Sequence, residues 1–139
     1  MGMGIRELLL VEDSPDDEVL TRRALSKLQS GVKVRIAHDG MEAASLLGLV
    51  EAGAGNVQPL PDLVLLDIRM PRMGGHEVLR RIRQNPRTAA LDVVVLSSSD
   101  EPVDVAYTKN LGAEHVRKPI DYDAYLNEVV GIVKKHLAV

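Results

Sequence analysis

Short apolar runs alternate with segments of helical periodicity, five of each, and this alternation restricts the possible fold more than any other feature. Apolar runs of about four to eight residues are typical of strands buried on both faces of a parallel sheet. They occupy residues 8–11, 32–37, 63–66, 93–96 and, more weakly, 114–117. The segments with helical spacing are 14–28, 39–52, 75–83, 101–111 and 121–137. We therefore predict an α/β fold, a doubly wound parallel sheet with helices on both faces.

The length of 139 residues is that of one domain, so residues 1–139 are expected to form a single domain without an output domain. Residues 53–61 are rich in Gly and Pro, which predicts an extended loop. No apolar run approaches the roughly 18 residues of a membrane span, and the start lacks the apolar stretch of a secretory signal. We expect a soluble, cytoplasmic protein with no membrane partner.

Composition excludes several classes of function. The chain contains no cysteine, which rules out disulfides, thiolate metal sites, iron–sulfur clusters and a cysteine nucleophile. It has 17 Lys and Arg against 20 Asp and Glu, a net charge of -3, and so lacks the basic surplus that nucleic-acid binding usually demands. Phe and Trp are absent, which argues against a single-strand nucleic-acid binder built on aromatic stacking.

Polar residues follow four of the five predicted strands. In an open parallel sheet, ligands bind at the carboxyl ends of the strands. Taken alone, Asp67 is better explained as the start of a solvated loop and Lys118 as an exposed charge than by any function. Their convergence on one edge of the sheet favours a shared chemical task. The residues are Glu12 and Asp13 after the first strand, Asp67 after the third, Ser97 after the fourth and Lys118 after the fifth.

Residues 14–17, which come next after Glu12 and Asp13, have a sufficient structural explanation. Ser14 is a helix N-cap and Pro15 suits the first helical position. Asp16 and Asp17 favour the positive end of the helix dipole. No functional role is therefore assigned to these four residues.

Clustered carboxylates repel one another and favour a hard divalent cation, and oxygen-only ligation by few protein groups suits Mg²⁺. A carboxylate beside such a cation can attack phosphorus and form an acyl phosphate. The phosphoryl oxygens then need a positive charge and a hydroxyl donor, which Lys118 and Ser97 would supply.

These residues stand in segments that resemble the receiver domain of bacterial two-component response regulators, over about residues 7–137. The segments are 9–13, 61–75 with its Asp-x-x-Met-Pro and Gly, 93–99, 111–113 and Lys118-Pro119. The resemblance implies a flavodoxin-like, five-stranded parallel sheet of order 2-1-3-4-5 with five helices in three layers. It also implies that Asp67 accepts a phosphoryl group from a sensor histidine kinase. Such a protein is a switch that catalyses its own phosphotransfer and slow dephosphorylation, and it is not otherwise an enzyme.

The same resemblance assigns roles to the site residues. Asp13, Asp67, Glu12 and the backbone carbonyl of Arg69 would bind Mg²⁺, for which Mn²⁺ or Ca²⁺ could substitute. Ser97 and Lys118 would bind the phosphoryl oxygens, and the Lys118–Pro119 bond would be cis. The Arg69 side chain and Ser99 would tune hydrolysis of the acyl phosphate, although solvated loop positions are the equal alternative.

One position departs from the family pattern. Receivers usually have Tyr or Phe three residues before the conserved Lys, and this chain has His115. In the family that ring moves inward when the hydroxyl after the fourth strand, here Ser97, swings toward the phosphate. His115 could act as the switch and would add a titratable group. The alternative is a partly exposed residue at the edge of the sheet. The span from Gly112 to Lys118 is also one residue shorter than usual.

With no output domain, the signal is expected to leave through protein contacts. Residues 11–18, the long second helix with its loop, and residues 118–125 resemble stand-alone regulators paired with bacterial phytochrome kinases, which makes a bacteriophytochrome a candidate partner. Tyr107, Tyr122 and Tyr125 lie in the last third and suggest an interface, including a homodimer. Tyr125 also fits the core, and Tyr122 is the best candidate for exposure.

Two other functions compete with the phosphoacceptor switch. A pseudo-receiver that serves as a binding scaffold should have lost Asp13, Asp67 or Lys118, and all three are present. A phosphatase of the haloacid-dehalogenase type needs a second Asp two residues after the nucleophile, where this chain has Arg69.

Overall fold

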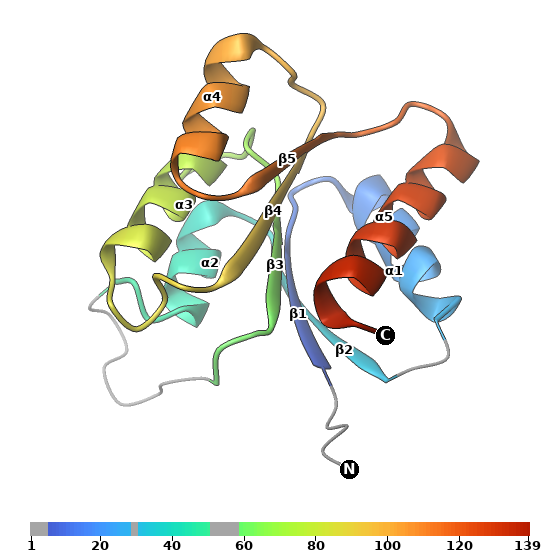
Figure 1. Cartoon of the computed structure of the whole chain (residues 1–139), viewed down its shortest axis with the longest axis horizontal. Coiled ribbons are helices and arrows are strands. Elements are labelled where there is room, and N and C mark those ends of the chain that lie inside the picture. The colour runs from blue at the N-terminus through green and yellow to red at the C-terminus, as the bar shows by residue number, and fades with distance from the viewer. Residues whose placement is uncertain (1–5, 29–30, 51–58) are drawn as a thin grey trace.

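The computed structural model describes residues 6–28, 31–50 and 59–139, and these form a five-stranded parallel sheet flanked by helices (Figure 1). The strand order is β2-β1-β3-β4-β5, which confirms the predicted flavodoxin-like topology. The strands are β1 (Arg6–Val11), β2 (Val32–Ala37), β3 (Leu63–Leu66), β4 (Asp92–Ser97) and β5 (Glu114–Arg117). The helices are α1 (Pro15–Ser26), α2 (Gly40–Leu46), α3 (Gly75–Gln84), α4 (Pro102–Asn110) and α5 (Tyr122–Leu137).

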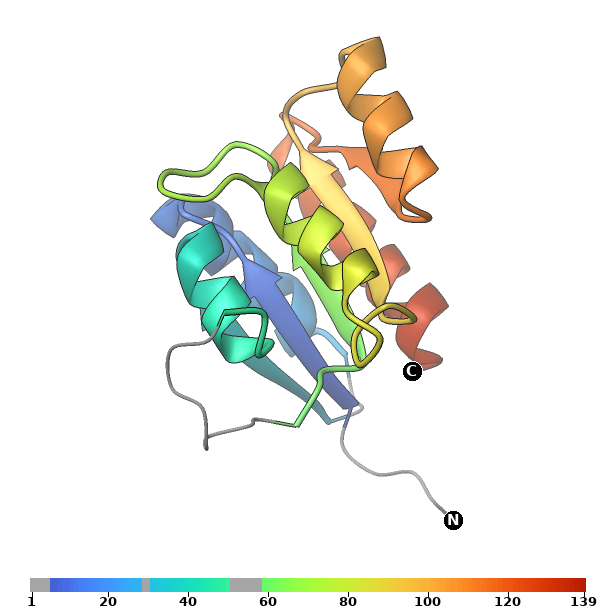
Figure 2. The same ribbon diagram turned by 90° about the vertical axis from the view of Figure 1, so that its left-hand side faces the viewer.

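The helices form two layers, one on each face of the sheet. Helices α1 and α5 cover one face, whereas α2, α3 and α4 cover the other (Figures 1 and 2). Successive residues of β1 alternate between the two layers, because side chains of a strand point to opposite faces. Leu9 packs with the α2 and α3 side, and Leu8 packs with the α1 and α5 side. This two-sided burial explains why the central strands are continuously apolar.

Polar caps begin three of the helices. The Ser14 side chain accepts a hydrogen bond from the backbone N–H of Asp17, Asp39 caps α2, and Asp121 caps α5. Each cap satisfies a backbone donor that the first helical turn leaves free. The predicted start of α1 at Ser14 is confirmed. In the described part of the chain, no helix has both the length and the apolar character needed to cross a bilayer.

The second helix is shorter than predicted. It ends at Leu46, and Gly48 adopts a left-handed φ of 72° that terminates it. The predicted helix extends to residue 52 because apolar residues continue at helical spacing, yet Leu47 and Val50 contact the core from outside the helix. Residues 53–58 of the predicted loop lie outside the described residues, and residues 59–61 are neither helix nor strand.

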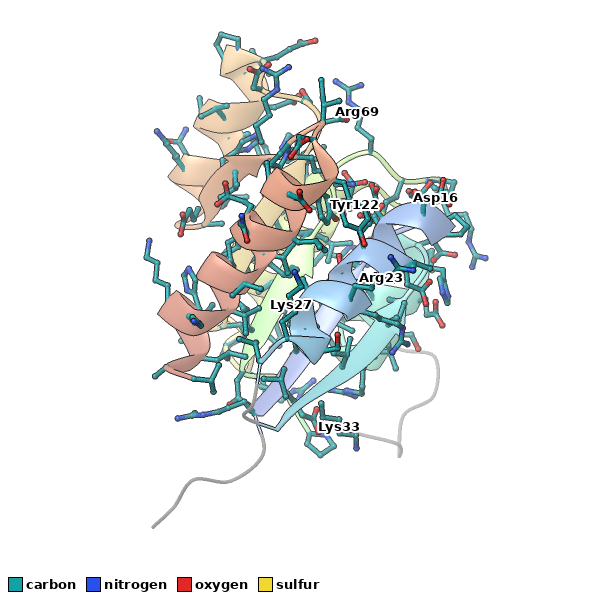
Figure 3. All side chains as sticks on the ribbon, turned by 90° about the vertical axis from the view of Figure 1, so that its right-hand side faces the viewer. Asp16, Arg23, Lys27, Lys33, Arg69 and Tyr122 are labelled. Atoms are coloured by element: carbon teal, nitrogen blue, oxygen red, sulfur yellow. The ribbon has the colours of Figure 1, made fainter. Side chains whose placement is uncertain are left out.

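The three tyrosines separate into surface and core positions. Tyr107 and Tyr122 are exposed, and Figure 3 shows Tyr122 close to Arg23 of α1, whose guanidinium donates a 2.6 Å hydrogen bond to the Tyr122 hydroxyl. Tyr125 is 3% exposed, and its hydroxyl lies 3.3 Å from Thr21 Oγ1. The prediction of Tyr125 as an interface residue is therefore wrong, because its ring lies on the apolar stripe of α5.

The burial of Tyr125 makes the stability of the fold sensitive to alkali. Burial raises the pKa of Tyr125 to about 12. Its contribution to stability is therefore complete below the unfolded value of about 10 and is lost as the pH rises through 12. In urea unfolding, we expect the free energy of unfolding to fall across this range and Tyr125→Phe to remove part of the fall. An unchanged pH dependence in Tyr125→Phe, equal to that of the control Tyr122→Phe, would contradict this.

Candidate functional site

The carboxyl ends of four strands converge at one edge of the sheet. Parallel pairing aligns Val11 with Leu66, Leu66 with Val95, and Ser97 with Arg117. The residues next in the chain after β1, β3 and β5, together with the last residue of β4, therefore gather at the same edge of the sheet. They are Glu12, Asp67, Lys118 and Ser97.

The Lys118 ammonium lies at the centre of the site and binds three carboxylates. Its Nζ donates to Asp17 Oδ2 at 2.7 Å, to Glu12 Oε1 at 2.8 Å and to Asp67 Oδ2 at 3.2 Å. Glu12 and Asp67 are buried, and only a small part of Lys118 is exposed. Asp17 is the partner that sequence reasoning missed, because its position in the first turn of α1 already had a sufficient explanation.

Burial and charge shift the pKa values of this cluster. Burial raises the pKa of Glu12 to about 7, although the neighbouring Lys118 opposes the shift. Burial alone would lower the pKa of Lys118, but the charges of Glu12 and Asp67 and the hydrogen bond to Asp17 raise it overall. The ammonium is therefore a permanent positive charge at this edge of the sheet.

Three carboxylates at this edge fit a divalent cation. Glu12, Asp13 and Asp67 each offer an oxygen, and these oxygens all lie within 4.8 Å of one another. Glu12 and Asp67 are buried whereas Asp13 is exposed, so the group opens to solvent on one side. Hard oxygen donors that carry excess negative charge are the ligands that Mg²⁺, Mn²⁺ and Ca²⁺ accept. The predicted set of carboxylate ligands is thus brought together.

A cavity of about 480 Å³ lies beside these carboxylates, with a lining of Asp13, Ile68, Arg69, Met70, Pro71 and Asp104. The backbone N–H of Arg69 donates to Asp67 Oδ1 at 3.2 Å, which fixes the orientation of the carboxylate. The Arg69 guanidinium is 62% exposed and lies 3.5 Å from Asp104 Oδ2 and 3.4 Å from Ser99 Oγ. The cavity therefore lies next to Asp13 and to the residues that follow Asp67 in the chain.

Ser97 and Ser99 lie at the start of the loop between β4 and α4. Ser97 is fully buried, and its Oγ accepts a 3.2 Å hydrogen bond from the backbone N–H of Ser99. The Ser99 hydroxyl in turn donates to Asp104 on α4. The hydroxyl oxygen of Ser97, which is predicted to bind a phosphoryl oxygen, therefore accepts a hydrogen bond from the backbone of its own loop.

His115 joins β5 to this loop and to α4. Its Nε2 lies 2.8 Å from the carbonyl oxygen of Ser99, and its Nδ1 lies 3.2 Å from Thr108 Oγ1. A carbonyl only accepts, so Nε2 carries a proton and donates to Ser99. His115 is half-buried and has specific partners, whereas Thr108 is the buried residue of α4.

The Lys118–Pro119 bond is trans, so the prediction of a cis bond is wrong. The trans form of an X–Pro bond is favoured by about 0.5–1 kcal/mol unless the surroundings select the other. Here the backbone N–H of Lys118 donates to the Ser97 carbonyl at 2.8 Å. The Lys118 side chain still donates to Glu12, Asp17 and Asp67. The contacts of Lys118 are therefore satisfied with the ordinary isomer.

The chain is similar to known response regulators. The chain is 38% identical over 98 residues to the response regulator Rcp1 of Synechocystis sp. (strain PCC 6803), which covers 70% of this chain and 65% of that protein. It is 36% identical over 118 residues to a probable methanogenesis regulatory protein, FilR2, of Methanothrix harundinacea, covering 84% and 74%.

Solved structures show the same likeness. The phosphorylated cyanobacterial phytochrome response regulator RcpA superposes with a TM-score of 0.89 at 31% identity, covering 97% of this chain and 96% of that one. The Mn²⁺-bound form of Rcp1 superposes with a TM-score of 0.86 at 32% identity, covering 93% and 92%. The family model of the response regulator receiver domain matches residues 8–130. The chain therefore belongs to the response regulator receiver family of two-component systems.

Proposed function

We propose that this receiver accepts a phosphoryl group on Asp67 with the help of Mg²⁺ and passes the signal on through protein contacts. One observation carries the proposal. The Asp67 carboxylate is buried at the end of β3, 3.2 Å from the Lys118 ammonium, and shares a 4.8 Å cluster with Glu12 and Asp13. The Asp67 carboxylate has a fixed ammonium beside it and belongs to a group of carboxylates that can bind a divalent metal. This arrangement suits nucleophilic attack by Asp67 on phosphorus.

The residues divide the chemistry among themselves. An Asp67 oxygen forms the new bond to phosphorus while the bond from phosphorus to the donor nitrogen or oxygen breaks. Lys118 neutralises one phosphoryl oxygen, and Ser97 would donate to another. A divalent cation held by Glu12, Asp13, Asp67 and the Arg69 carbonyl would supply further neutralisation of the transferred group.

The donor proposed for this reaction is the phosphohistidine of a sensor histidine kinase, and this partnership implies a cytoplasmic location. A bacteriophytochrome is the candidate kinase, since RcpA is a phytochrome response regulator of nearly the same length and fold. The described residues form the receiver, and the signal is proposed to leave it through protein contacts on its surface.

The proposed route from the site to that surface runs through His115. Phosphorylation adds charge beside Ser97 and shifts a two-state equilibrium. His115 links the Ser99 carbonyl to Thr108 of α4, so a movement of the loop between β4 and α4 would also displace α4. Tyr107 and Tyr122 are exposed on α4 and α5, where they are available for a downstream partner or a second copy.

The two competing functions fit the site less well. A binding scaffold has no need for Asp67, Asp13 and Lys118, yet the structure brings all of them together. A phosphatase of the haloacid-dehalogenase type would place a general acid two residues after the nucleophile. That position is Arg69, whose guanidinium is exposed and bound to Asp104.

Incubation with acetyl phosphate and Mg²⁺, followed by intact mass measurement, tests the proposal. We expect one phosphoryl adduct that borohydride reduction and peptide mapping locate at Asp67, and none when EDTA replaces Mg²⁺. No adduct under any condition would favour the scaffold. Rapid release of phosphate from varied phosphate esters would favour the phosphatase.

A further inference from the structure

Asp17 makes the shortest contact of the Lys118 ammonium, although it lies outside the acidic cluster. Its Oδ2 is 2.7 Å from Nζ, and the two residues are 101 positions apart in the chain. The Asp17 side chain belongs to the first turn of α1, where its backbone N–H donates to Ser14 Oγ. The cap therefore fixes the backbone position from which the Asp17 side chain reaches Lys118.

The three acceptors of Lys118 differ in what else they can bind. An ammonium has three donors, and Glu12, Asp17 and Asp67 each accept one. Glu12 and Asp67 are also two of the three carboxylates that fit a divalent cation, whereas Asp17 is not in that group. A divalent cation bound by these carboxylates would compete with Lys118 for Glu12 and Asp67. It would leave Asp17 free to accept a hydrogen bond from Lys118.

We propose that Asp17 is a positioning residue that keeps the Lys118 ammonium beside Asp67 when a divalent cation occupies the carboxylate cluster. A lysine side chain has four flexible methylene groups and loses much rotamer freedom when it is held in one place. The Asp17 carboxylate supplies the contact that offsets this loss. The inference rests on the proposed phosphorylation of Asp67, although the position of the ammonium can be measured without it.

The neighbouring residue provides a matched control. Asp16 lies in the same turn of α1, is exposed, and is labelled at the end of that helix in Figure 3. Asp16→Asn and Asp17→Asn remove the same charge from the same turn, and both keep a side chain of nearly the same shape. Only Asp17→Asn removes the carboxylate that accepts from Lys118.

The direct experiment is ¹⁵N-detected NMR of the lysine ammonium groups, with Lys118 assigned by the loss of its signal in Lys118→Arg. The unmodified protein and Asp16→Asn should show a protected Lys118 signal with and without Mg²⁺. Asp17→Asn should lose that signal when Mg²⁺ is added. A protected signal in Mg²⁺-loaded Asp17→Asn would overturn the inference, whether or not the protein is phosphorylated.

The rate of labelling by acetyl phosphate gives a second readout. We expect Asp17→Asn to lower the rate of labelling about threefold to tenfold. The effect is modest because the ion pair between Asp17 and Lys118 is partly exposed to solvent. Asp16→Asn should label at the normal rate, and Asp17→Glu should recover part of the loss. In a Lys118→Met background, Asp17→Asn should have no further effect, since Asp17 acts through Lys118.

The possible results are distinguishable. If the unmodified protein takes no adduct, the proposed function fails, and the NMR experiment alone decides the role of Asp17. If Asp16→Asn slows labelling as much as Asp17→Asn, the effect is one of general charge and the inference is wrong. It is also wrong if Asp17→Asn slows labelling equally in the presence and absence of the Lys118 ammonium.

Discussion

Replacing Asp67 with asparagine is expected to abolish the phosphoryl adduct completely while the protein remains folded. The amide has nearly the same shape as the carboxylate but lacks its negative charge and nucleophilicity. Lys118 keeps its contacts with Glu12 and Asp17 in this variant, so the site retains paired charges. Intact mass after treatment with acetyl phosphate and Mg²⁺ measures the loss, and circular dichroism checks the fold.

The matched control for this variant is Asp123→Asn. Asp123 is an exposed carboxylate in the first turn of α5, and its replacement should leave labelling unchanged. An adduct of undiminished yield on Asp67→Asn would show that another residue is the phosphoacceptor. Loss of the adduct in both variants would point to a general effect of charge.

Gly75→Ala is expected to lower the free energy of unfolding by about 3 kcal/mol or more, which is at the upper end for overpacking. A Cβ at this position would lie 2.2 Å from the carbonyl oxygen of Asp67 and 2.7 Å from Cα of Ile68. Both are backbone atoms, so relief requires a shift of α3 or of the segment that carries Asp67. The Gly75 backbone N–H also donates to the Ile68 carbonyl at 2.8 Å. Urea unfolding measures the loss, and we expect slower labelling of Asp67 as well.

Gly131→Ala provides the contrast, because a Cβ there meets nothing within 4 Å. Gly131 lies inside α5, where alanine should stabilise the helix by about 0.5–1 kcal/mol. The two substitutions add the same atom and should have opposite signs. A Gly75→Ala variant as stable as the unmodified protein would show that the backbone at Asp67 and Ile68 shifts at little cost. The close packing against Gly75 would then not hold Asp67 in position.

The strands and most helix starts could be predicted because their signals are local. A continuous apolar run such as Leu63–Leu66 is typical of a strand buried on both faces, and the Ser14 cap acts within its own turn. The end of α2 was mispredicted for a related reason. Leu47 and Val50 keep helical spacing, but they contact the core from beyond the end of the helix, where Gly48 permits a turn.

The members of the candidate site were also largely predictable, but their partners were not. Glu12, Asp13, Asp67 and Lys118 were recognised because each follows a strand at the same edge of the sheet. Nothing near His115 in the sequence indicates that its ring joins Ser99 to Thr108. The isomer of the Lys118–Pro119 bond likewise depends on surroundings that lie far away in the chain.

Local sequence patterns predict the alternation of strands and helices, the edge of the sheet at which the polar groups gather and the receiver family that the chain resembles. These follow from periodicity, caps and motifs, which act over a few neighbouring residues. No such local pattern predicts that three carboxylates share the Lys118 ammonium or that Asp17 is one of them, because the folded chain alone brings these groups together. The physical reason is that a buried charge is stabilised by whichever partners the fold brings within about 3 Å, and these partners come from distant parts of the chain.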